Sequence, residues 1–234
     1  MSQIPPAGPA RTALLLGATG LVGRHTLARL AADARWSRVV TLARRPVERA
    51  SDTHEAHIVD FDRLGDADPA LWVCDDLFCA LGTTIRDAGS QAAFRHVDLE
   101  IPAEAAGLAR AAGATQALLV SSMGADARSR VFYNRVKAEA EAAIRGAGFE
   151  AVHVVRPSLL TGERAASRTG ERVAEAVLGM ARPFLVGPLR TFRPTAAEDV
   201  AAALVEIAAA RRPGATVYDP EAIRAWAATA RAGR

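Results

Sequence analysis

The chain has 234 residues, half of them hydrophobic and 24% charged, as expected for a globular protein whose length suits one large domain with a sizeable core. Its net charge is +3, but the arginines are scattered and no aromatic residues are interleaved with them, which argues against a nucleic-acid partner. The apolar runs are too short to span a membrane, and the first residues lack the features of a signal peptide. Cys74 and Cys79 form no CxxC or Cys/His cluster. We therefore expect a reduced, cytoplasmic protein with no membrane partner.

The predicted elements alternate along the chain. Residues 1–11 are rich in proline and glycine and are expected to form a flexible tail ahead of a single domain over residues 12–234. Strands are predicted over 13–16, 38–42, 57–59, 76–81, 116–120 and 151–155, and helices over 21–32, 97–112 and 131–145. Residues 158–234 are expected to form a small C-terminal cap that shapes a pocket, with a helix over 195–210 and a possible strand over 215–218.

This alternation predicts the fold class. Fully apolar strands that alternate with helices are typical of a parallel sheet covered on both faces. Because crossover connections are right-handed, the result is an α/β protein with a doubly wound, mostly parallel sheet of the Rossmann type.

The first strand runs directly into the turn Gly17-Ala18-Thr19-Gly20-Leu21-Val22-Gly23, which opens a helix. Gly17 permits the tight turn, Gly20 lets the backbone approach a pyrophosphate, and Gly23 lets the helix pack closely on the strand. The anion then meets the N–H groups of Leu21, Val22 and their neighbours at the helix N-terminus, with Thr19 beside them. In this context the turn indicates a dinucleotide site, whereas the alternative is a plain tight turn.

The second strand indicates which dinucleotide is bound. An acidic residue about 20 residues past the glycines usually holds the ribose 2′-OH of NAD. This chain instead carries Arg44 and Arg45, and guanidinium groups pair with a 2′-phosphate by charge and by geometry. NADP(H) is therefore favoured over NAD(H); the alternative is a solvated arginine pair on a loop.

Two further strand ends are candidates for cofactor contacts. Asp60 and Phe61 follow the third strand and are suited to contact adenine, although Asp60 is equally suited to cap a turn. Ala80, Leu81 and Gly82 follow the fourth strand at the carboxyl edge of the sheet, where ligands bind.

Tyr133 and Lys137 lie four residues apart on a predicted helix, and Ser121 and Ser122 end the fifth strand. A nearby ammonium stabilises a phenolate, so Tyr133 is suited to give a proton to a carbonyl oxygen as hydride arrives at carbon. Ser122, with Ser121 as the alternative, would hydrogen-bond that oxygen, and Lys137 would also reach the nicotinamide ribose. The competing interpretation is a packed tyrosine and a solvated lysine.

These motifs resemble the short-chain dehydrogenase/reductase superfamily, and within it the atypical members of the Tat-interacting-protein-like and bacterial oxidoreductase-like group. The resemblance rests on the glycine turn and on the segments Leu81-Gly82-Thr83-Thr84, Ser121-Ser122-Met123-Gly124-Ala125-Asp126, Tyr133-Asn134-Arg135-Val136-Lys137 and Arg156-Pro157-Ser158, over roughly residues 12–205. It implies NADP(H) binding, the Ser–Tyr–Lys roles above and main-chain contacts from Pro157 and Ser158 to the carboxamide. The turn after the fourth strand and Asp98, where many members carry asparagine, depart from the superfamily pattern.

The leading hypothesis is an NADP(H)-dependent oxidoreductase that reduces a small carbonyl compound. The alternative is an NADP(H)-binding sensor with a protein partner and little turnover, because fold does not imply catalysis. The five histidines have no metal-like spacing and no acidic partners in register, so no metal is expected. Arg86 is suited either to an anionic substrate or to a solvated loop. The chain is expected to be a monomer or a homodimer, with the helices over 97–112 and 131–146 as the candidate dimer face.

Overall fold

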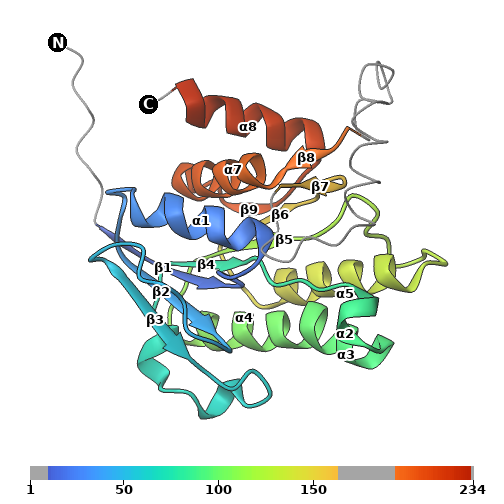
Figure 1. The fold of residues 1–234 in the computed structure, drawn as a ribbon, viewed down its shortest axis with the longest axis horizontal. Helices are drawn as coiled ribbons and strands as arrows, with labels where there is room; N and C mark the ends of the chain where they lie inside the picture. The colour runs from blue at the N-terminus through green and yellow to red at the C-terminus, as the bar shows by residue number, and fades with distance from the viewer. Residues whose placement is uncertain (1–9, 163–192, 233–234) are drawn as a thin grey trace.

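The computed structural model describes residues 10–162 and 193–232, which form a seven-stranded sheet between two layers of helices (Figure 1). The strand order is β3-β2-β1-β4-β5-β6-β9, and every neighbouring pair is parallel. The strands are β1 (Arg11–Leu16), β2 (Trp36–Ala43), β3 (His54–Ile58), β4 (Asp76–Cys79), β5 (Gln116–Val120), β6 (Ala151–Val155) and β9 (Gly214–Tyr218). The chain order reverses between β1 and β4, which is where doubly wound sheets bind ligands.

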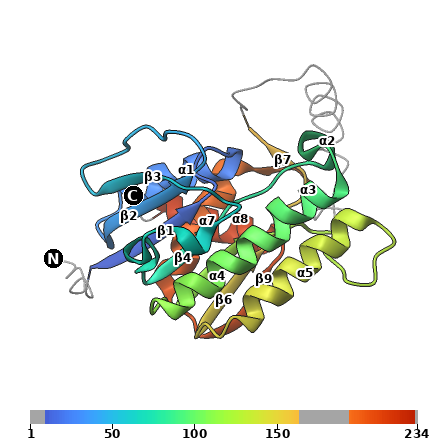
Figure 2. The same cartoon turned by 90° about the horizontal axis from the view of Figure 1, so that it is seen from below.

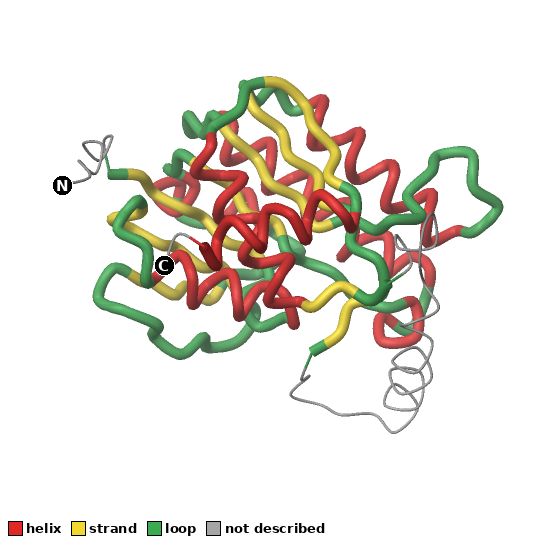
Figure 3. The backbone as a smooth tube through the Cα atoms, turned by 90° about the horizontal axis from the view of Figure 1, so that it is seen from above, coloured by secondary structure: helices red, strands yellow, loops and turns green. Residues whose placement is uncertain are grey.

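Helices cover both faces of this sheet. One face carries α1 (Leu21–Ala31), α7 (Ala197–Ala210) and α8 (Pro220–Ala232), and seen from above these helices lie over the strands (Figure 3). The other face carries α4 (Ile101–Ala111) and α5 (Phe132–Gly146), side by side in Figure 2. Shorter elements are the 3-10 turns Leu64–Asp66 and Pro69–Trp72, the helices α2 (Ile85–Ala88) and α3 (Gln91–Arg95), the π-helical turn His96–Glu100, and the strand pair β7 (Leu160–Thr161) and β8 (Thr195–Ala196).

The apolar strands bury both of their faces, because successive side chains point to opposite sides of a sheet. On β1, Leu14 and Leu16 join the core under α4 and α5, whereas Ala13 and Leu15 join the core under α1 and α7. All four side chains are inaccessible to solvent. The predicted doubly wound α/β fold is confirmed.

Several strand boundaries differ from the sequence prediction, most clearly in β1, β3 and β4. β1 begins at Arg11, inside the predicted tail, and the tail residues 1–9 lie outside the described residues. β3 begins at His54 rather than at residue 57, because only His54 of this edge strand is buried and the strand has no apolar run. β4 ends at Cys79, and Ala80 then turns towards the glycine loop after donating its backbone N–H to Leu16.

Of the predicted C-terminal cap, residues 163–192 lie outside the described residues, and most of the described remainder packs into the layers around the main sheet. β9 pairs with β6 and extends the main sheet, and α7 packs between α1 and α8. α8 was not predicted from the sequence. Only residues 158–162 of the described part reach the cleft at the carboxyl edge of the sheet, through Ser158, Leu159 and Leu160.

A buried ionic network lies at the opposite, amino-terminal edge. Arg11 pairs with Asp76, whose carboxylate also accepts hydrogen bonds from Trp36 Nε1 and Gln116 Nε2, both at 2.8 Å. The Asp76 side chain is fully buried and that of Arg11 is 9% exposed.

Asp76→Ala leaves the Arg11 charge buried without a partner, so we expect it to lower the free energy of unfolding by about 3–5 kcal/mol. Glu55→Gln is the matched control, because Glu55 pairs with Arg38 at 2.8 Å but is 46% exposed; its loss should stay below about 1 kcal/mol. Urea denaturation of both variants measures the difference. Equal losses of unfolding free energy in the two variants would contradict the conclusion that burial makes the Arg11–Asp76 pair the more important one.

Candidate cofactor and active site

The glycine turn after β1 is shaped by close backbone contacts. Gly17 has a φ of +87°, and a Cβ there would lie 2.6 Å from the carbonyl carbon of Ala80. A Cβ at Gly23 would lie 1.9 Å from the carbonyl oxygen of Gly17, so this position requires glycine for the helix to approach the turn. Gly20 donates its N–H to Gly17 O at 2.9 Å.

This turn presents the N-terminus of α1 to the cleft. Gly20 is the N-cap, no described side chain caps the helix, and its first turn contains no acidic residue. The first N–H groups of a helix have no intrahelical partner and carry partial positive charge. The turn therefore has the geometry and the electrostatics of a phosphate site.

Two adjoining hollows of about 620 and 900 Å³ lie along the carboxyl edge of the sheet. Both are lined by Thr19 and Gly20 of the glycine turn and by Ala80–Thr83 after β4. The first extends over β2 and β3, and the second extends over β5, β6 and α5. The two hollows together form a cleft with one end for each nucleotide of a dinucleotide.

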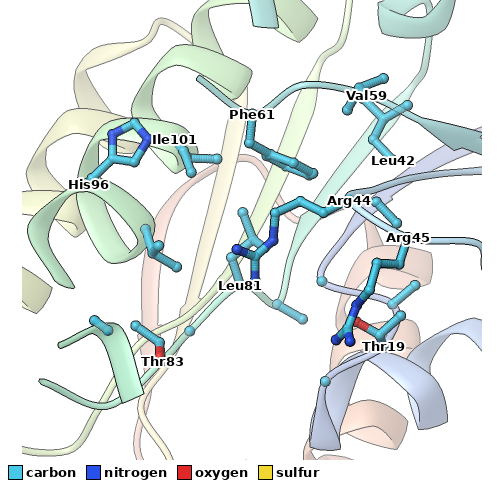
Figure 4. A pocket seen from close by; sticks show the side chains of 18 of the residues that line it. Thr19, Leu42, Arg44, Arg45, Val59, Phe61, Leu81, Thr83, His96 and Ile101 are labelled. Carbon is cyan, nitrogen blue, oxygen red and sulfur yellow. The ribbon is translucent and has the colours of Figure 1, made fainter. Parts of the chain in front are cut away.

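The first hollow has an apolar side and a cationic side (Figure 4). Phe61, Val59, Leu42 and Ile101 form the apolar side, and the Phe61 ring is buried. Arg44 and Arg45 extend into the hollow, with Arg45 beside Thr19 in Figure 4. Within the described residues neither guanidinium is held in an ion pair.

Asp60 takes the turn-capping geometry that the sequence left as one of two alternatives. Its Oδ1 accepts a hydrogen bond from the backbone N–H of Asp62 at 3.0 Å. Its side chain nevertheless lines the first hollow beside Phe61.

The second hollow brings together the residues proposed for catalysis. Ser122, Tyr133, Lys137, Pro157 and Ser158 all line it, as do Leu21 and Val22. Tyr133 packs on Phe94 with ring centroids 5.3 Å apart. Of the predicted site residues, Gly23 lines neither hollow, in keeping with its packing role, and Arg86 also lies outside both.

Lys137 is buried and ion-paired, in contrast to a solvated lysine. Its Nζ lies 2.7 Å from Asp98 Oδ1, and its side chain is 7% exposed. Burial lowers the pKa of the Lys137 ammonium, but Asp98 and Tyr133 outweigh this effect and hold that pKa above its ordinary value. The ammonium is therefore a permanent charge in the cleft at neutral pH.

The two serines at the end of β5 have different environments. The Ser121 hydroxyl is buried and donates to Glu141 Oε1 at 2.6 Å. Both serines line the second hollow, but Ser122 is half-buried and, within the described residues, its hydroxyl makes no such bond. This geometry favours Ser122 as the hydroxyl that faces a substrate.

Glu141 was missed by the sequence analysis. Its carboxylate is buried and accepts hydrogen bonds from Arg156 at 2.8 and 2.6 Å and from Arg145 at 2.8 Å. Burial raises the pKa of Glu141, but the hydrogen bonds from Arg156 and Ser121 outweigh it and hold that pKa below its ordinary value. The network ties α5 to the ends of β5 and β6. The available signal was spacing, because Glu141 follows Lys137 by one helical turn.

The expectation that no histidine has an acidic partner in register is wrong for His96, because Glu100 lies four residues further on, and His57 also lies 3.6 Å from Glu55. Its Nε2 lies 2.8 Å from Asp62 Oδ1 and its Nδ1 lies 3.1 Å from Glu100 Oε2. His96 lines the first hollow, so the pairs link the loop after β3 to the π-helical turn across that site. Asp62 is 34 residues away in the chain, which is why the local pattern did not reveal it.

Glu100 and Asp62 raise the pKa of His96. The ion pairs of His96 therefore stabilise the folded state fully at pH values below the unfolded-state pKa of about 6.5. This stabilisation is lost as the pH rises through the raised pKa of His96 in the folded state. We expect His96→Asn to lower the melting temperature more at pH 5.5, where the imidazole is charged, than at pH 8.5. Calorimetry at both values measures this.

His25→Asn is the control for that experiment. Burial and Arg24 lower the pKa of His25, so its charged form disfavours the fold and the pH dependence should have the opposite sign. A His96→Asn deficit that is the same at both pH values would contradict the assigned ion pairs.

The parallel sheet, the glycine cradle and the cleft at the reversal point define a Rossmann-type dinucleotide-binding protein. Residues 17–211 match the family described as NAD(P)H-binding, and the chain belongs to that family. It is 36% identical to protein HTATIP2 of Rattus norvegicus over 172 residues, which cover 72% of this chain and 71% of the relative. It is 35% identical to "Protein fmp52, mitochondrial" of Emericella nidulans over 174 residues, 70% of this chain and 73% of the relative. The resemblance inferred from the sequence motifs is confirmed.

Solved structures share the fold at low sequence identity. The chain is similar to MoeE5 in complex with UDP-glucuronic acid and NAD, with a TM-score of 0.68, 19% identity, and coverage of 88% of this chain and 75% of that chain. It is also similar to a mutated uronate dehydrogenase, with a TM-score of 0.61, 14% identity, and coverage of 89% and 74%. The protein therefore has an NAD(P)-binding, oxidoreductase-like fold.

Two features are absent from the part of the chain that the structure describes. No helix there is long and apolar enough to cross a membrane, and no cluster of histidine, cysteine, aspartate or glutamate is arranged to hold a metal ion. Because the fungal relative carries the word mitochondrial in its name, the cytoplasmic location stays a prediction.

Proposed function

We propose that this protein is an NADP(H)-dependent reductase of small carbonyl compounds, with Ser122, Tyr133 and Lys137 as its catalytic residues. The observation that carries the proposal is that all three side chains line the same cleft as the glycine cradle. Cofactor and reacting groups then meet at one edge of the sheet, which is what hydride transfer to a bound carbonyl requires.

The composition of the chain gives this site independent support. Lys137 is the only lysine among the 29 cationic side chains of lysine and arginine, and all the others are arginine. In a chain that otherwise uses only arginine, one buried lysine between a tyrosine and a carboxylate points to a need for a compact ammonium. A solvated surface lysine would carry no such requirement.

The residues present fit a bound NADP(H). The N-terminus of α1 is suited to the pyrophosphate, and Arg44 and Arg45 are suited to a 2′-phosphate. Phe61 and its apolar neighbours are suited to the adenine, and Pro157 and Ser158 to the carboxamide. Lys137 lies at the other end, within the hollow suited to the nicotinamide ribose.

Bound NADPH would supply a hydride to the carbonyl carbon and leave as NADP⁺. Tyr133 would donate its hydroxyl proton to the carbonyl oxygen, which gives an alcohol, and the phenolate would then regain a proton from solvent. Ser122 would hydrogen-bond the same oxygen and orient it. Lys137 would stabilise the transient phenolate by its charge.

The substrate end of the cleft favours a small, largely apolar carbonyl compound. Ile85, Met123, Leu159 and Leu160 line the second hollow around Tyr133 and Ser122. Ile85 is 36% exposed and Leu159 is 47% exposed, so both present apolar surface. Burying that surface against a substrate is favourable, at about 25 cal/mol per Å².

One observation favours the second candidate, an NADP(H) sensor with little turnover. The Lys137 charge is offset by Asp98 at 2.7 Å, which weakens its effect on a phenolate. A screen of carbonyl compounds that follows NADPH absorbance separates the two candidates. Consumption of NADPH supports the reductase, and tight NADPH binding without consumption supports the sensor.

Replacing Arg44 and Arg45 together by alanine should weaken NADPH binding by about 10-fold or more and leave NADH binding nearly unchanged, because only NADPH carries the 2′-phosphate. Calorimetric titration measures both affinities. Arg49→Ala is the control, since Arg49 lies on the same connection but outside the first hollow. Equal loss for the two cofactors would refute the assignment.

Tyr133→Phe removes the proton donor and keeps the ring that packs on Phe94. We expect turnover of a reducible carbonyl to fall by about 10²–10⁴-fold while NADPH affinity is kept. Steady-state kinetics and cofactor titration on the same preparation check both parts. Unchanged turnover would exclude Tyr133 as the acid.

A further inference from the structure

Asp98 occupies an unusual place beside the proposed catalytic lysine. It lies in the π-helical turn His96–Glu100, between α3 and α4, and its side chain is fully buried. Single π-helical turns inside helices occur frequently at functional sites. Asp98 also lines the second hollow, so it is buried against the cleft rather than in the apolar core.

The two carboxylate oxygens of Asp98 have different partners. Oδ2 accepts the backbone N–H of Thr83 at 2.9 Å, in the turn that follows β4. Oδ1 lies 2.7 Å from Lys137 Nζ on α5. One side chain therefore connects the cofactor-facing turn, the π-helical turn and the helix that carries Tyr133.

The charge around Lys137 comes from few groups. Asp98, Tyr133 and the Cys79 thiol of β4 face the ammonium, and burial raises the pKa of Cys79 to about 11, so that the thiol is neutral at physiological pH. Arg24 of α1 and Asp87 of α2 line the same hollow. Asp98 is therefore the carboxylate in direct contact with Lys137.

We propose that Asp98 is a positioning residue that holds the Lys137 ammonium beside Tyr133 and offsets its charge, so that Tyr133 stays in its neutral, proton-carrying form. An unpaired ammonium would favour the phenolate, which is the form suited to alcohol oxidation. The neutral phenol is the form that donates a proton during carbonyl reduction. The inference rests on the proposed function of Tyr133, and it adds that the site favours carbonyl reduction over alcohol oxidation.

The first test uses the wild-type protein and its single lysine. Labelling with [ε-¹³C]lysine gives one lysine resonance, which reports Lys137 alone. If the ion pair exists in solution, the lysine should titrate above the ordinary value of 10.5. A midpoint below 10.5 is what burial without a partner produces, and it would overturn the proposal.

The second test uses Asp98→Asn, which removes the charge and keeps an acceptor for the Thr83 N–H. Labelling with [ζ-¹³C]tyrosine gives two resonances, from Tyr133 and Tyr218, and Tyr133→Phe assigns them. The titration midpoint of the Tyr133 signal should fall by about one pH unit in Asp98→Asn. The Tyr218 signal is an internal reference, because its hydroxyl lies against His153 and outside the cleft.

Glu139→Gln is the matched control. Glu139 lies on α5 two residues after Lys137 but pairs with Arg95 at 2.5 Å at the surface. Its loss should leave the Tyr133 midpoint unchanged. An unmoved midpoint in Asp98→Asn, or an equal shift in Glu139→Gln, would overturn the proposal.

Neither titration requires turnover, so both remain decisive if the carbonyl screen finds no substrate. If Asp98→Asn does not fold, the wild-type lysine titration decides alone. With a reducible substrate in hand, the acidic shift should also appear in the pH profile of reduction, as an earlier decline towards high pH in Asp98→Asn.

Discussion

The structure depends on the close approach of three backbone segments at the carboxyl edge of β1. Gly17 touches the backbone after β4, and Gly23 at the start of α1 touches the carbonyl of Gly17. No side chain fits into either contact, so the turn brings the N-terminus of α1 against the cleft. The cofactor end and the catalytic end of the cleft share this turn, because Thr19 and Gly20 line both hollows.

Three buried carboxylates lie at two opposite edges of the sheet, one at the edge far from the cleft and two at the edge that forms it. Asp76, at the amino-terminal edge of the sheet, pairs with Arg11 at the start of the neighbouring strand β1. Glu141 and Asp98 lie at the carboxyl edge, where they pair with Arg156 and Lys137. Each carboxylate is compensated by a cation, as burial of charge requires. The pairs at the carboxyl edge also set which groups face the cleft.

Much of the fold was predictable because its signals are local. Apolar strands, helical spacing and the glycine turn are each contained in a few consecutive residues, and β1, β2, β5 and β6 were predicted close to their observed bounds. β3 and α8 were less visible, because an edge strand and a surface helix bury only part of their residues. The extension of the sheet by β9 depends on a pairing with β6 across more than fifty residues.

By itself the sequence determined the class of protein, the position of the phosphate cradle and the candidate roles of Tyr133 and Lys137. These follow from spacing along one strand–turn–helix unit and along one helix. Only the tertiary structure decided that Ser121 bonds to Glu141, that His96 meets Asp62, and that Lys137 is paired with Asp98. Such contacts join segments far apart in the chain, and the burial that sets their charges exists only once the layers have packed.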